Sequence, residues 1–354
     1  MNYQKAKLFL FLFFIYINLY LYKQIGLKEE KNKKFVGEVK LNKNIINLAF
    51  NIDNKYIYQS LVLMTSLLDN IGPNTKYQIH ILHSKSFEQR YIDKLNKFVE
   101  NCPNNTFNLF FYNMQNNFTL STRGLYISIA AYYRIALPSI LPNESRIIYI
   151  DTDVINFEDL TEMYNLELKD NIYFRGTLDN PGLSNEIKKL GIYIDKYMND
   201  GIMLINLEAM RKDNVEKKIR DFVITHFLDH HDQTAINAIC YDHWEILPYK
   251  YAMFRYNKFK FFREINEGQN IKYRISENEL RKAYNKSTFL HYVGYTKPWN
   301  KNNKDAFNEY WWYYAKKSMF YEEILSIYNF NQSDVDKLIE KIPSDGGLLR
   351  NYKK

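Results

Sequence analysis

Two carboxylates one residue apart, Asp151 and Asp153, are the first feature of this sequence that points to chemistry. They follow directly on the segment Arg146–Ile150, whose apolar pattern predicts a buried strand. In open α/β sheets ligands bind beyond the carboxyl ends of the strands, and oxygen ligands at that place suit Mg²⁺ or Mn²⁺. An Asp-x-Asp pair is also common in surface loops, so this interpretation depends on the strand before it.

A second group of functional residue types lies far downstream, in the run HYVGYTKPW at residues 291–299. His291 is a candidate metal ligand, and a histidine added to carboxylates favours Mn²⁺. Gly294 would let the backbone approach a phosphate, and Lys297 would offer that phosphate a point charge. The alternative interpretation of this run is a surface loop that buries Trp299.

Three further histidines, His226, His230 and His231, come just before Asp232 and suggest a zinc site. His226 and His230 have the i, i+4 spacing of helical ligands, but no glutamate lies between them as HExxH requires. We therefore favour polar residues at a helix end over a zinc site.

The formal net charge of +8 on this 354-residue chain lies at its two ends. Residues 1–44 hold nine lysines and three glutamates, hence +6, and the last five residues add +3. The residues between them therefore carry −1. Nucleic-acid readers concentrate Lys and Arg on their folded face, so we expect no nucleic-acid partner. Two cysteines exclude a disulfide scaffold and a cysteine-only zinc site.

The basic N-terminal part surrounds an apolar run, LFLFLFFIYINLYLY at residues 8–22. As a helix this run would be about 22 Å long, against a bilayer core of about 30 Å, and its tyrosines suit the interface. No small-x-small cleavage pattern follows it. We favour an uncleaved single-pass anchor over a cleaved signal peptide or an interfacial helix, which predicts a membrane-associated protein. The flanking lysines favour a cytoplasmic body, whereas a eukaryotic secretory enzyme would face the Golgi lumen.

Hydrophobic periodicity alternates between strand and helix from residue 45 onward. The expected strands cover residues 45–50, 77–82, 107–112, 146–150 and 203–207. The expected helices cover residues 59–68, 88–99, 122–140 and 212–228. This order predicts an α/β domain with a mostly parallel central sheet flanked by helices. Neither a GxGxxG nor a GxxxxGK[ST] loop occurs, so a nucleotide would be held in another way.

After Trp299 the sequence is rich in aromatic residues and helical in period, with Phe307, Trp311 and Tyr314 on one face. We favour a face packed on the domain over an interfacial membrane helix. The expected organisation is an apolar anchor and basic stem over residues 1–44, a catalytic domain over 45–300 and a helical extension with a basic tail over 301–354.

Six ordered matches between residues 45 and 300 resemble glycosyltransferase family 8, the retaining nucleotide-sugar transferases. They are FNIDNKY at 50–56, YYRI at 132–135, YIDTD at 149–153, YMNDGIMLINL at 197–207, HDQT at 231–234 and HYVGYTKPW at 291–299. The resemblance implies a GT-A type nucleotide-sugar-binding fold. It also implies transfer of a hexose from UDP-glucose or UDP-galactose to a glycan, lipid-linked or protein-linked acceptor, with Mn²⁺ or alternatively Mg²⁺.

The resemblance also implies roles on the donor side of the site. Asp53 and Tyr56 would hold the uridine, and Gly294 and Lys297 would contact the diphosphate. The ligands of the metal ion bridging that diphosphate would be Asp151, Asp153 and His291.

On the sugar side, the resemblance implies that Arg134 braces the donor near its sugar. Asn199, Asp232 and Gln233 would line the sugar and the reaction centre. Asp179, a weaker match, lies where the family often has a carboxylate for a sugar hydroxyl.

The sequence departs from the family pattern at two positions, Lys55 and Asp200. Lys55 stands in a loop that usually reads Asp-Asp-Asn-Tyr, where it would add a charge to the diphosphate or point to solvent. Asp200 stands where a small residue is usual, so it would reach the acceptor or disturb the sugar pocket. Both departures bear on the donor sugar rather than on the reaction class.

Three functions remain open on the sequence. A transferase would use front-face attack with the leaving phosphate as base, because no carboxylate nucleophile stands in the usual position. A catalytically decayed, membrane-tethered sugar-nucleotide-binding protein would be expected to lose motif residues, yet all are present. A nucleotide-sugar hydrolase or sugar-phosphate transferase on the same sheet would fit the run at residues 291–299 less well.

Overall fold

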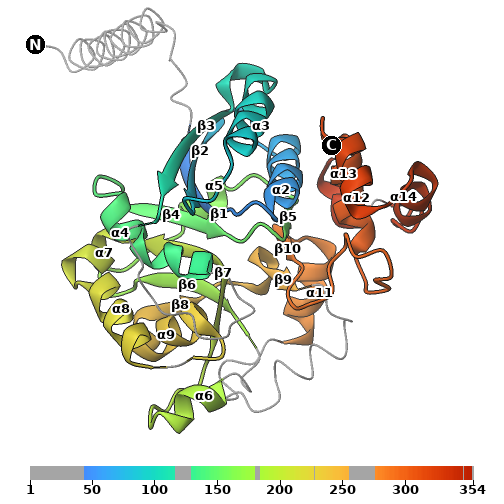
Figure 1. Ribbon diagram of the computed structural model, residues 1–354. Coiled ribbons are helices and arrows are strands. Elements are labelled where there is room, and N and C mark those ends of the chain that lie inside the picture. The colour runs from blue at the N-terminus through green and yellow to red at the C-terminus, as the bar shows by residue number, and fades with distance from the viewer. Residues whose placement is uncertain are drawn as a thin grey trace, which may run out of the picture. The chain divides into compact units, whose positions relative to one another are not determined.

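A computed structural model of the chain describes residues 44–115, 129–179, 184–226, 228–254, 276–345 and 347–352 (Figure 1). The chain divides into two compact units, Met1–Lys43 and Asn44–Lys354, and the described residues all belong to the second. The anchor expected at residues 8–22 lies outside the described residues, as does nearly all of the expected stem. Among the described residues, no helix is both long and apolar enough to cross a bilayer.

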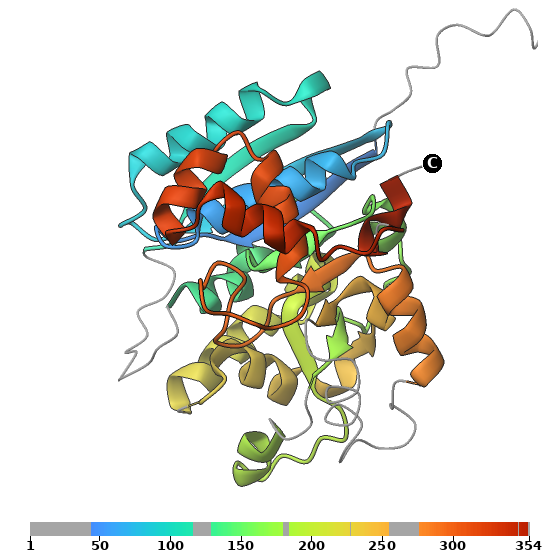
Figure 2. The same ribbon diagram turned by 90° about the vertical axis from the view of Figure 1, so that its right-hand side faces the viewer.

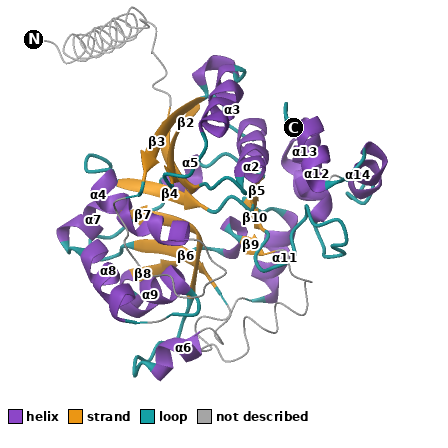
Figure 3. Cartoon of the chain, in the orientation of Figure 1, coloured by secondary structure: helices purple, strands orange, loops and turns teal. Residues whose placement is uncertain are grey.

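Seven strands form the central sheet of the described residues, in the order β3-β2-β1-β4-β7-β6-β8 (Figure 3). They are β1 (Asn44–Asn51), β2 (Thr75–His83), β3 (Phe107–Asn113), β4 (Arg146–Ile150), β6 (Phe174–Leu178), β7 (Met198–Asn206) and β8 (Trp244–Ile246). The strands from β3 to β4 are parallel, and so are β6 and β8, whereas β7 runs antiparallel to both of its neighbours. The predicted fold class is therefore confirmed.

The first half of the sheet follows the predicted alternation of strand and helix. α2 (Ile57–Asp69) connects β1 to β2, and α3 (Gln89–Glu100) lies between β2 and β3. α2 is buried from Ile57 to Leu67, whereas α3 buries only Leu95 and Phe98 and exposes its charged face. Each helix is recognisable from sequence because its apolar spacing is a local property.

Side chains of β1 and β4 alternate between two hydrophobic cores, one on each face of the sheet. Leu48 and Ile148 belong to the first core, which also holds α2 and α3, and Ala49 and Ile147 belong to the second. The helices that contribute to the second core are α4 (Leu137–Ile140), α7 (Leu207–Lys212), α8 (Val215–Thr225) and α9 (His231–Ile239). The shorter elements are η1 (Pro103–Asn105), α5 (Thr161–Tyr164), α6 (Ser184–Lys189) and η4 (Tyr241–His243).

The helix expected over residues 122–140 is not continuous in its described part. A 3₁₀ helix, η2 (Ile129–Ala136), is followed by the single turn of α4, and residues 122–128 lie outside the described residues. Pro138 stands in the first turn of α4. A proline has no N–H to donate and crowds the preceding turn, so an α-helix cannot run through it without a break.

β7 begins at Met198, five residues before the start predicted from its apolar run. The strand therefore includes the polar pair Asn199 and Asp200, which sequence reasoning left outside it. All its residues but the last are buried, because β7 lies between β4 and β6 in the middle of the sheet. Polar groups at such a central position must find partners, which makes them candidates for a site.

A small second sheet joins two distant parts of the chain. It consists of β5 (Val154–Asn156), β10 (Phe289–His291) and β9 (Met253–Phe254), in the order β5-β10-β9, and η5 (Tyr249–Tyr251) precedes β9. β10 pairs antiparallel with β5, so that His291 lies opposite Val154. This pairing brings the end of β10 beside Asp153.

The C-terminal extension is helical, as predicted, with α12 (Asn308–Lys317), α13 (Tyr321–Tyr328), α14 (Gln332–Ile339) and η7 (Gly347–Tyr352). A further helix that was not predicted, α11 (Glu277–Asn285), comes before β10. α12 packs against α2 (Figure 2). Trp311, Trp312 and Tyr314 are fully buried in the first core. A face packed on the domain is therefore confirmed. Phe307 departs from the prediction, because it precedes α12 with a φ of 69°. The domain boundary at residue 300 stays a prediction.

Candidate active site

The end of β4 and the end of β10 bring Asp151, Asp153 and His291 together. Nε2 of His291 lies 3.2 Å from Oδ1 of Asp153 and 3.9 Å from Oδ2 of Asp151. One ligand atom from each of the three residues lies within 4.8 Å of the others, the arrangement that a single metal ion requires. The structure thus assembles the three residues expected to bind a metal, and their role as ligands stays a prediction.

Gly201 on β7 leaves the space beside this group. A Cβ atom at this position would collide with the imidazole of His291 and would lie 2.8 Å from Oδ2 of Asp151. The lack of a side chain here therefore keeps open a cradle bordered by two of the three candidate ligands, Asp151 and His291. Two carboxylates and an imidazole around it form a donor set that fits Mn²⁺ well.

Lys297 lies beside the same group. Its Nζ is 2.5 Å from Oδ2 of Asp153 and donates to the carbonyl of Tyr292 at 2.7 Å. Burial acts to raise the pKa of Asp153, but the charges of Lys297 and His291 outweigh burial and hold that pKa below its usual range. Gly294, between His291 and Lys297, has a φ of 84°, a left-handed conformation that glycine adopts readily.

A cavity of about 400 Å³ opens next to Asp151 and Asp153. Its lining residues are Asn51, Asp53, Lys55, Tyr56, Ala130, Ala131, Arg134, Tyr149, Asp151, Thr152 and Asp153. The cavity thus joins the loop between β1 and α2 to the end of β4. The residues expected to hold uridine therefore line one space with two of the three residues expected to hold the metal, Asp151 and Asp153.

The loop between β1 and α2 is held by Asp53. Its Oδ1 accepts the backbone N–H groups of Lys55 at 2.8 Å and Tyr56 at 3.0 Å. The ring of Tyr56 meets Trp299 edge to face, with centroids 6.3 Å apart. Burial, followed by the charge of Asp153, raises the pKa of Tyr56 to about 12, so the phenol keeps its proton.

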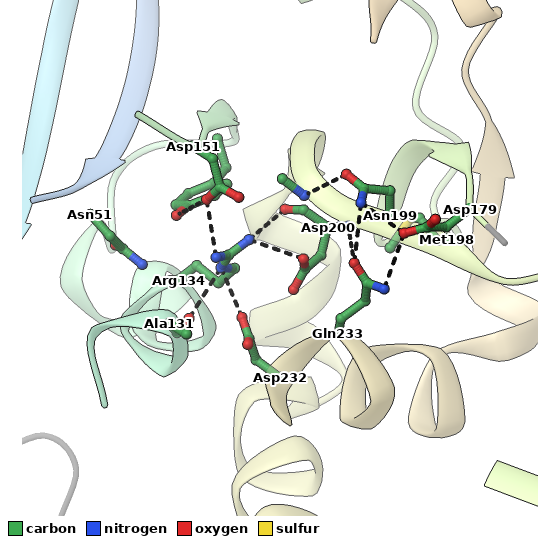
Figure 4. A network of polar contacts seen from close by, with 12 residues as sticks. Asn51, Ala131, Arg134, Asp151, Asp179, Met198, Asn199, Asp200, Asp232 and Gln233 are labelled. Atoms are coloured by element: carbon green, nitrogen blue, oxygen red, sulfur yellow. Dashed lines mark hydrogen bonds and ion pairs between the residues drawn. The ribbon is translucent and has the colours of Figure 1, made fainter. Parts of the chain in front are cut away.

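Arg134 is the centre of a buried charge cluster (Figure 4). Its Nη2 donates to Oδ1 of Asp151 at 3.1 Å. Its Nε lies 2.9 Å from Oδ2 of Asp232, and its Nη1 lies 3.3 Å from Oδ1 of Asp200 and donates to the Asp200 carbonyl at 2.6 Å. The expected role of bracing the sugar stays a prediction, and the described contacts show a guanidinium that holds three carboxylates.

Three carboxylates around one guanidinium leave an excess of negative charge. Burial would lower the pKa of Arg134, but Asp151, Asp200 and Asp232 outweigh burial and raise it. Burial raises the pKa of each of the three aspartates, although Arg134 opposes the rise. For Asp200 the neighbouring Asp232 adds to the increase. The departure at Asp200 thus faces Arg134 and not solvent.

A network of two amides and one carboxylate adjoins the cluster (Figure 4). Nδ2 of Asn199 donates to Oδ2 of Asp179 at 2.9 Å and to Oε1 of Gln233 at 3.3 Å. Nε2 of Gln233 also donates to Oδ2 of Asp179 at 3.3 Å. The weaker sequence match, Asp179, is therefore in direct contact with the two amides expected at the sugar.

Sequence reasoning missed two residues of the site, Gly201 and Tyr149. The Tyr149 hydroxyl donates to Oδ1 of Asp151 at 2.8 Å, and Arg134 lies 4.2 Å over its ring centroid. A sequence signal existed for Tyr149. It lies two residues before Asp151, and residues two apart on a strand point to the same face. Gly201 stands in the matched run at residues 197–207, but the need for a glycine there follows only from its contacts with Asp151 and His291.

The histidines near Asp232 form no metal site among the described residues. His226 stacks on Phe222 with ring centroids 4.2 Å apart, and Nδ1 of His231 lies 3.1 Å from the Tyr132 hydroxyl. His226 and His230 flank the ends of α8 and α9. This agrees with the preferred interpretation of polar residues at a helix end.

Known proteins resemble this chain in sequence and in fold. The Glycosyl transferase family 8 model matches residues 47–303. General stress protein A of Bacillus subtilis is 33% identical over 196 residues, which are 53% of this chain and 65% of that protein. The lipopolysaccharide 1,2-glucosyltransferase of Escherichia coli is 26% identical over 271 residues, 74% of this chain and 76% of that protein.

Among solved structures, galactosyltransferase LgtC in complex with donor and acceptor sugar analogs aligns with a TM-score of 0.62 at 19% identity. The alignment covers 80% of this chain and 100% of that chain, so the two share the GT-A type fold. This chain spans slightly less than two thirds of General stress protein A. The family model, in contrast, covers well over half of the chain, from β1 to beyond β10. The chain therefore belongs to glycosyl transferase family 8.

Proposed function

We propose that this protein transfers glucose or galactose from a UDP-sugar to an acceptor hydroxyl, with retention and with Mn²⁺. The observation that carries the proposal is the cavity lined by Asp53, Tyr56, Asp151 and Asp153, whose two carboxylates also form the Asp-Asp-His group with His291. Relatives named as a lipopolysaccharide glucosyltransferase and a galactosyltransferase support a hexose donor. The second function left open on the sequence, a decayed binding protein, gains no support from a site whose members are all present.

Asp151, Asp153 and His291 would hold the metal ion on the donor side. When bound, the ion supplies a Lewis acid for the charge that develops on the leaving diphosphate. Lys297 would add a point charge for the same phosphate oxygens. Its contact with Asp153 places that charge beside the metal-binding group.

Asn199, Gln233 and Asp179 would orient the sugar ring. Gln233 Oε1 receives hydrogen bonds from Asn199 Nδ2 and from the backbone N–H of Asp200, both at 3.3 Å, so its amide is held in one orientation. The amide oxygen of Gln233 and the carboxylate of Asp232 would place negative charge near the oxocarbenium-like centre. Front-face attack, with the leaving phosphate accepting the acceptor proton, needs no further nucleophile from the protein.

A donor screen tests this function. The full chain is incubated with Mn²⁺, UDP-glucose, UDP-galactose or UDP-N-acetylglucosamine, and a panel of glycosides, and both UDP release and product are measured. We expect UDP-glucose or UDP-galactose to give a glycoside with the anomeric configuration of the donor. Inverted product would contradict retention. Hydrolysis with every acceptor would instead favour a nucleotide-sugar hydrolase.

We also propose that residues 1–44 hold the enzyme at a membrane, where a lipid-linked or other glycan acceptor would be present. The apolar run at residues 8–22 and the surrounding lysines support this. Deletion of residues 1–44 should move the protein from the membrane fraction to the supernatant after centrifugation, with activity on a water-soluble acceptor retained. A truncated protein that stays wholly with the membrane would contradict the proposal.

A further inference from the structure

Lys297 and the metal-binding group share one carboxylate. Oδ2 of Asp153 lies 2.5 Å from the Lys297 ammonium, while Oδ1 of the same carboxylate lies 3.2 Å from Nε2 of His291. Both side chains of the pair are only 13% exposed, so solvent screens their interaction weakly. A change of charge at position 297 therefore acts directly on Asp153, a predicted metal ligand.

We propose that Lys297 couples the binding of the metal ion to the binding of the donor diphosphate. The proposal rests on the proposed function, which supplies both ligands. An ammonium on one oxygen of Asp153 reduces the negative charge that the other oxygen offers to a cation, so Lys297 weakens binding of the metal by itself. A diphosphate next to the ion offers Lys297 an alternative anionic partner, which restores the charge of Asp153 to the metal.

The contacts of Lys297 agree with a group that can change partners. Apart from Asp153, its described hydrogen bond goes to the backbone carbonyl of Tyr292, on the same loop. Along the chain, Gly294 with its left-handed φ lies between Tyr292 and Lys297. Lysine is suited to such an exchange, because its ammonium is a point charge on a flexible stem and needs no planar, bidentate partner.

A coupling role and a merely structural role of Lys297 predict opposite changes in metal affinity when Lys297 is replaced. If Lys297 only oriented Asp153, its removal would weaken metal binding, as loss of a group that holds a metal ligand commonly does. If Lys297 couples the two ligands, its removal strengthens binding of the metal alone. Because coupling is reciprocal, the same substitution reduces the factor by which UDP and Mn²⁺ tighten each other.

Mn²⁺ titration monitored by electron paramagnetic resonance, with and without saturating UDP, tests this on the full chain. For Lys297→Met we expect about tenfold tighter binding of Mn²⁺ alone, with the tightening caused by UDP reduced by about the same factor. Lys297→Gln serves as a second variant if the first does not fold, and Lys297→Arg, which keeps the charge, should stay near wild type. Lys301→Met, a lysine on the same segment that pairs with Asp334, is the control and should change neither affinity.

Unchanged or weaker binding of Mn²⁺ alone by both neutral variants would overturn the coupling role while leaving the proposed function intact. A wild-type chain that binds neither Mn²⁺ nor UDP would instead contradict the proposed function itself. The two failures are thus separate results of one experiment.

Discussion

The two sides of the candidate site satisfy their polar groups by different means. On the charged side, Arg134 neutralises part of the charge of Asp151, Asp200 and Asp232, all of them buried or partly buried. On the amide side, Asn199 and Gln233 meet one carboxylate, Asp179, through hydrogen bonds. Removing a charge on the first side leaves another charge buried without its partner. Removing an amide on the second side costs individual hydrogen bonds.

Strand β7 supplies residues to both sides of the site, because successive side chains of a strand point to opposite faces. Asn199 contacts the amide network, Asp200 the arginine, and Gly201 the metal-binding group. Three consecutive residues therefore serve three parts of the site. Substitutions along this strand should therefore separate the effects of losing charged contacts from the effects of losing the amide hydrogen bonds expected to orient the sugar. The following predictions use that difference.

The largest effect should come from the metal-binding group. Asp153→Ala removes one of three predicted ligands, and we expect hexose transfer with Mn²⁺ to fall by about 10³-fold or more, because the metal carries several kcal/mol of charge stabilisation. Gly201→Ala should lose Mn²⁺ binding as well, since its methyl group would collide with His291. Asp170→Ala, which removes an exposed carboxylate, is the control. Transfer by Asp153→Ala near the wild-type rate would refute the metal assignment.

Next in size is the effect of Arg134→Met on folding. Three carboxylates lose their common counter-charge in a buried place, so we expect the free energy of unfolding to fall by about 3–5 kcal/mol. Urea unfolding followed by circular dichroism measures this. Arg90→Met removes an exposed ion pair with Glu88 and should leave stability unchanged. Equal stability of Arg134→Met and wild type would show that the cluster needs no arginine.

A smaller effect is expected on the amide side. Asn199→Ala removes the hydrogen bonds to Asp179 and Gln233, and we expect kcat/KM for transfer to fall by about 10–100-fold, which corresponds to one or two hydrogen bonds. Mn²⁺ affinity should change little, in contrast to Asp153→Ala. Asn171→Ala, at an exposed position, is the control. Loss of Mn²⁺ binding in Asn199→Ala would show that the two sides are not separable.

The smallest effect should be a change in the pH dependence of stability. Burial raises the pKa of Asp200 above its unfolded value of 3.8, so the folded state binds more protons than the unfolded state above that pH. Stability then falls as pH rises from about 4 through the folded pKa. Asp200→Asn removes this contribution. The difference in free energy of unfolding between the variant and wild type, measured by urea unfolding, should therefore favour the variant by about 1 kcal/mol more at pH 8 than at pH 4. Parallel stability curves for the two proteins would contradict a raised pKa at Asp200.

Local patterns predicted the elements that depend on local periodicity. The strands and helices from β1 to β3 lie where the apolar spacing placed them, and β4 leads into Asp151 and Asp153 as expected. The 3₁₀ helix at Ile129–Ala136 was not predicted, because apolar spacing does not distinguish a 3₁₀ helix from an α-helix. β7 was predicted too short for a similar reason, since Asn199 and Asp200 look like loop residues until their partners are known.

By itself, the sequence determined the fold class, the family and the types of residue available for catalysis. Those follow from periodicity and from short ordered motifs, which are properties of neighbouring residues. Only the tertiary structure decided that Arg134 meets three aspartates, that Asp200 faces it, and that Gly201 leaves room beside His291. These contacts join η2, the end of β4, β7, α9 and β10, and their geometry is set by strand pairing and packing between segments far apart in the chain.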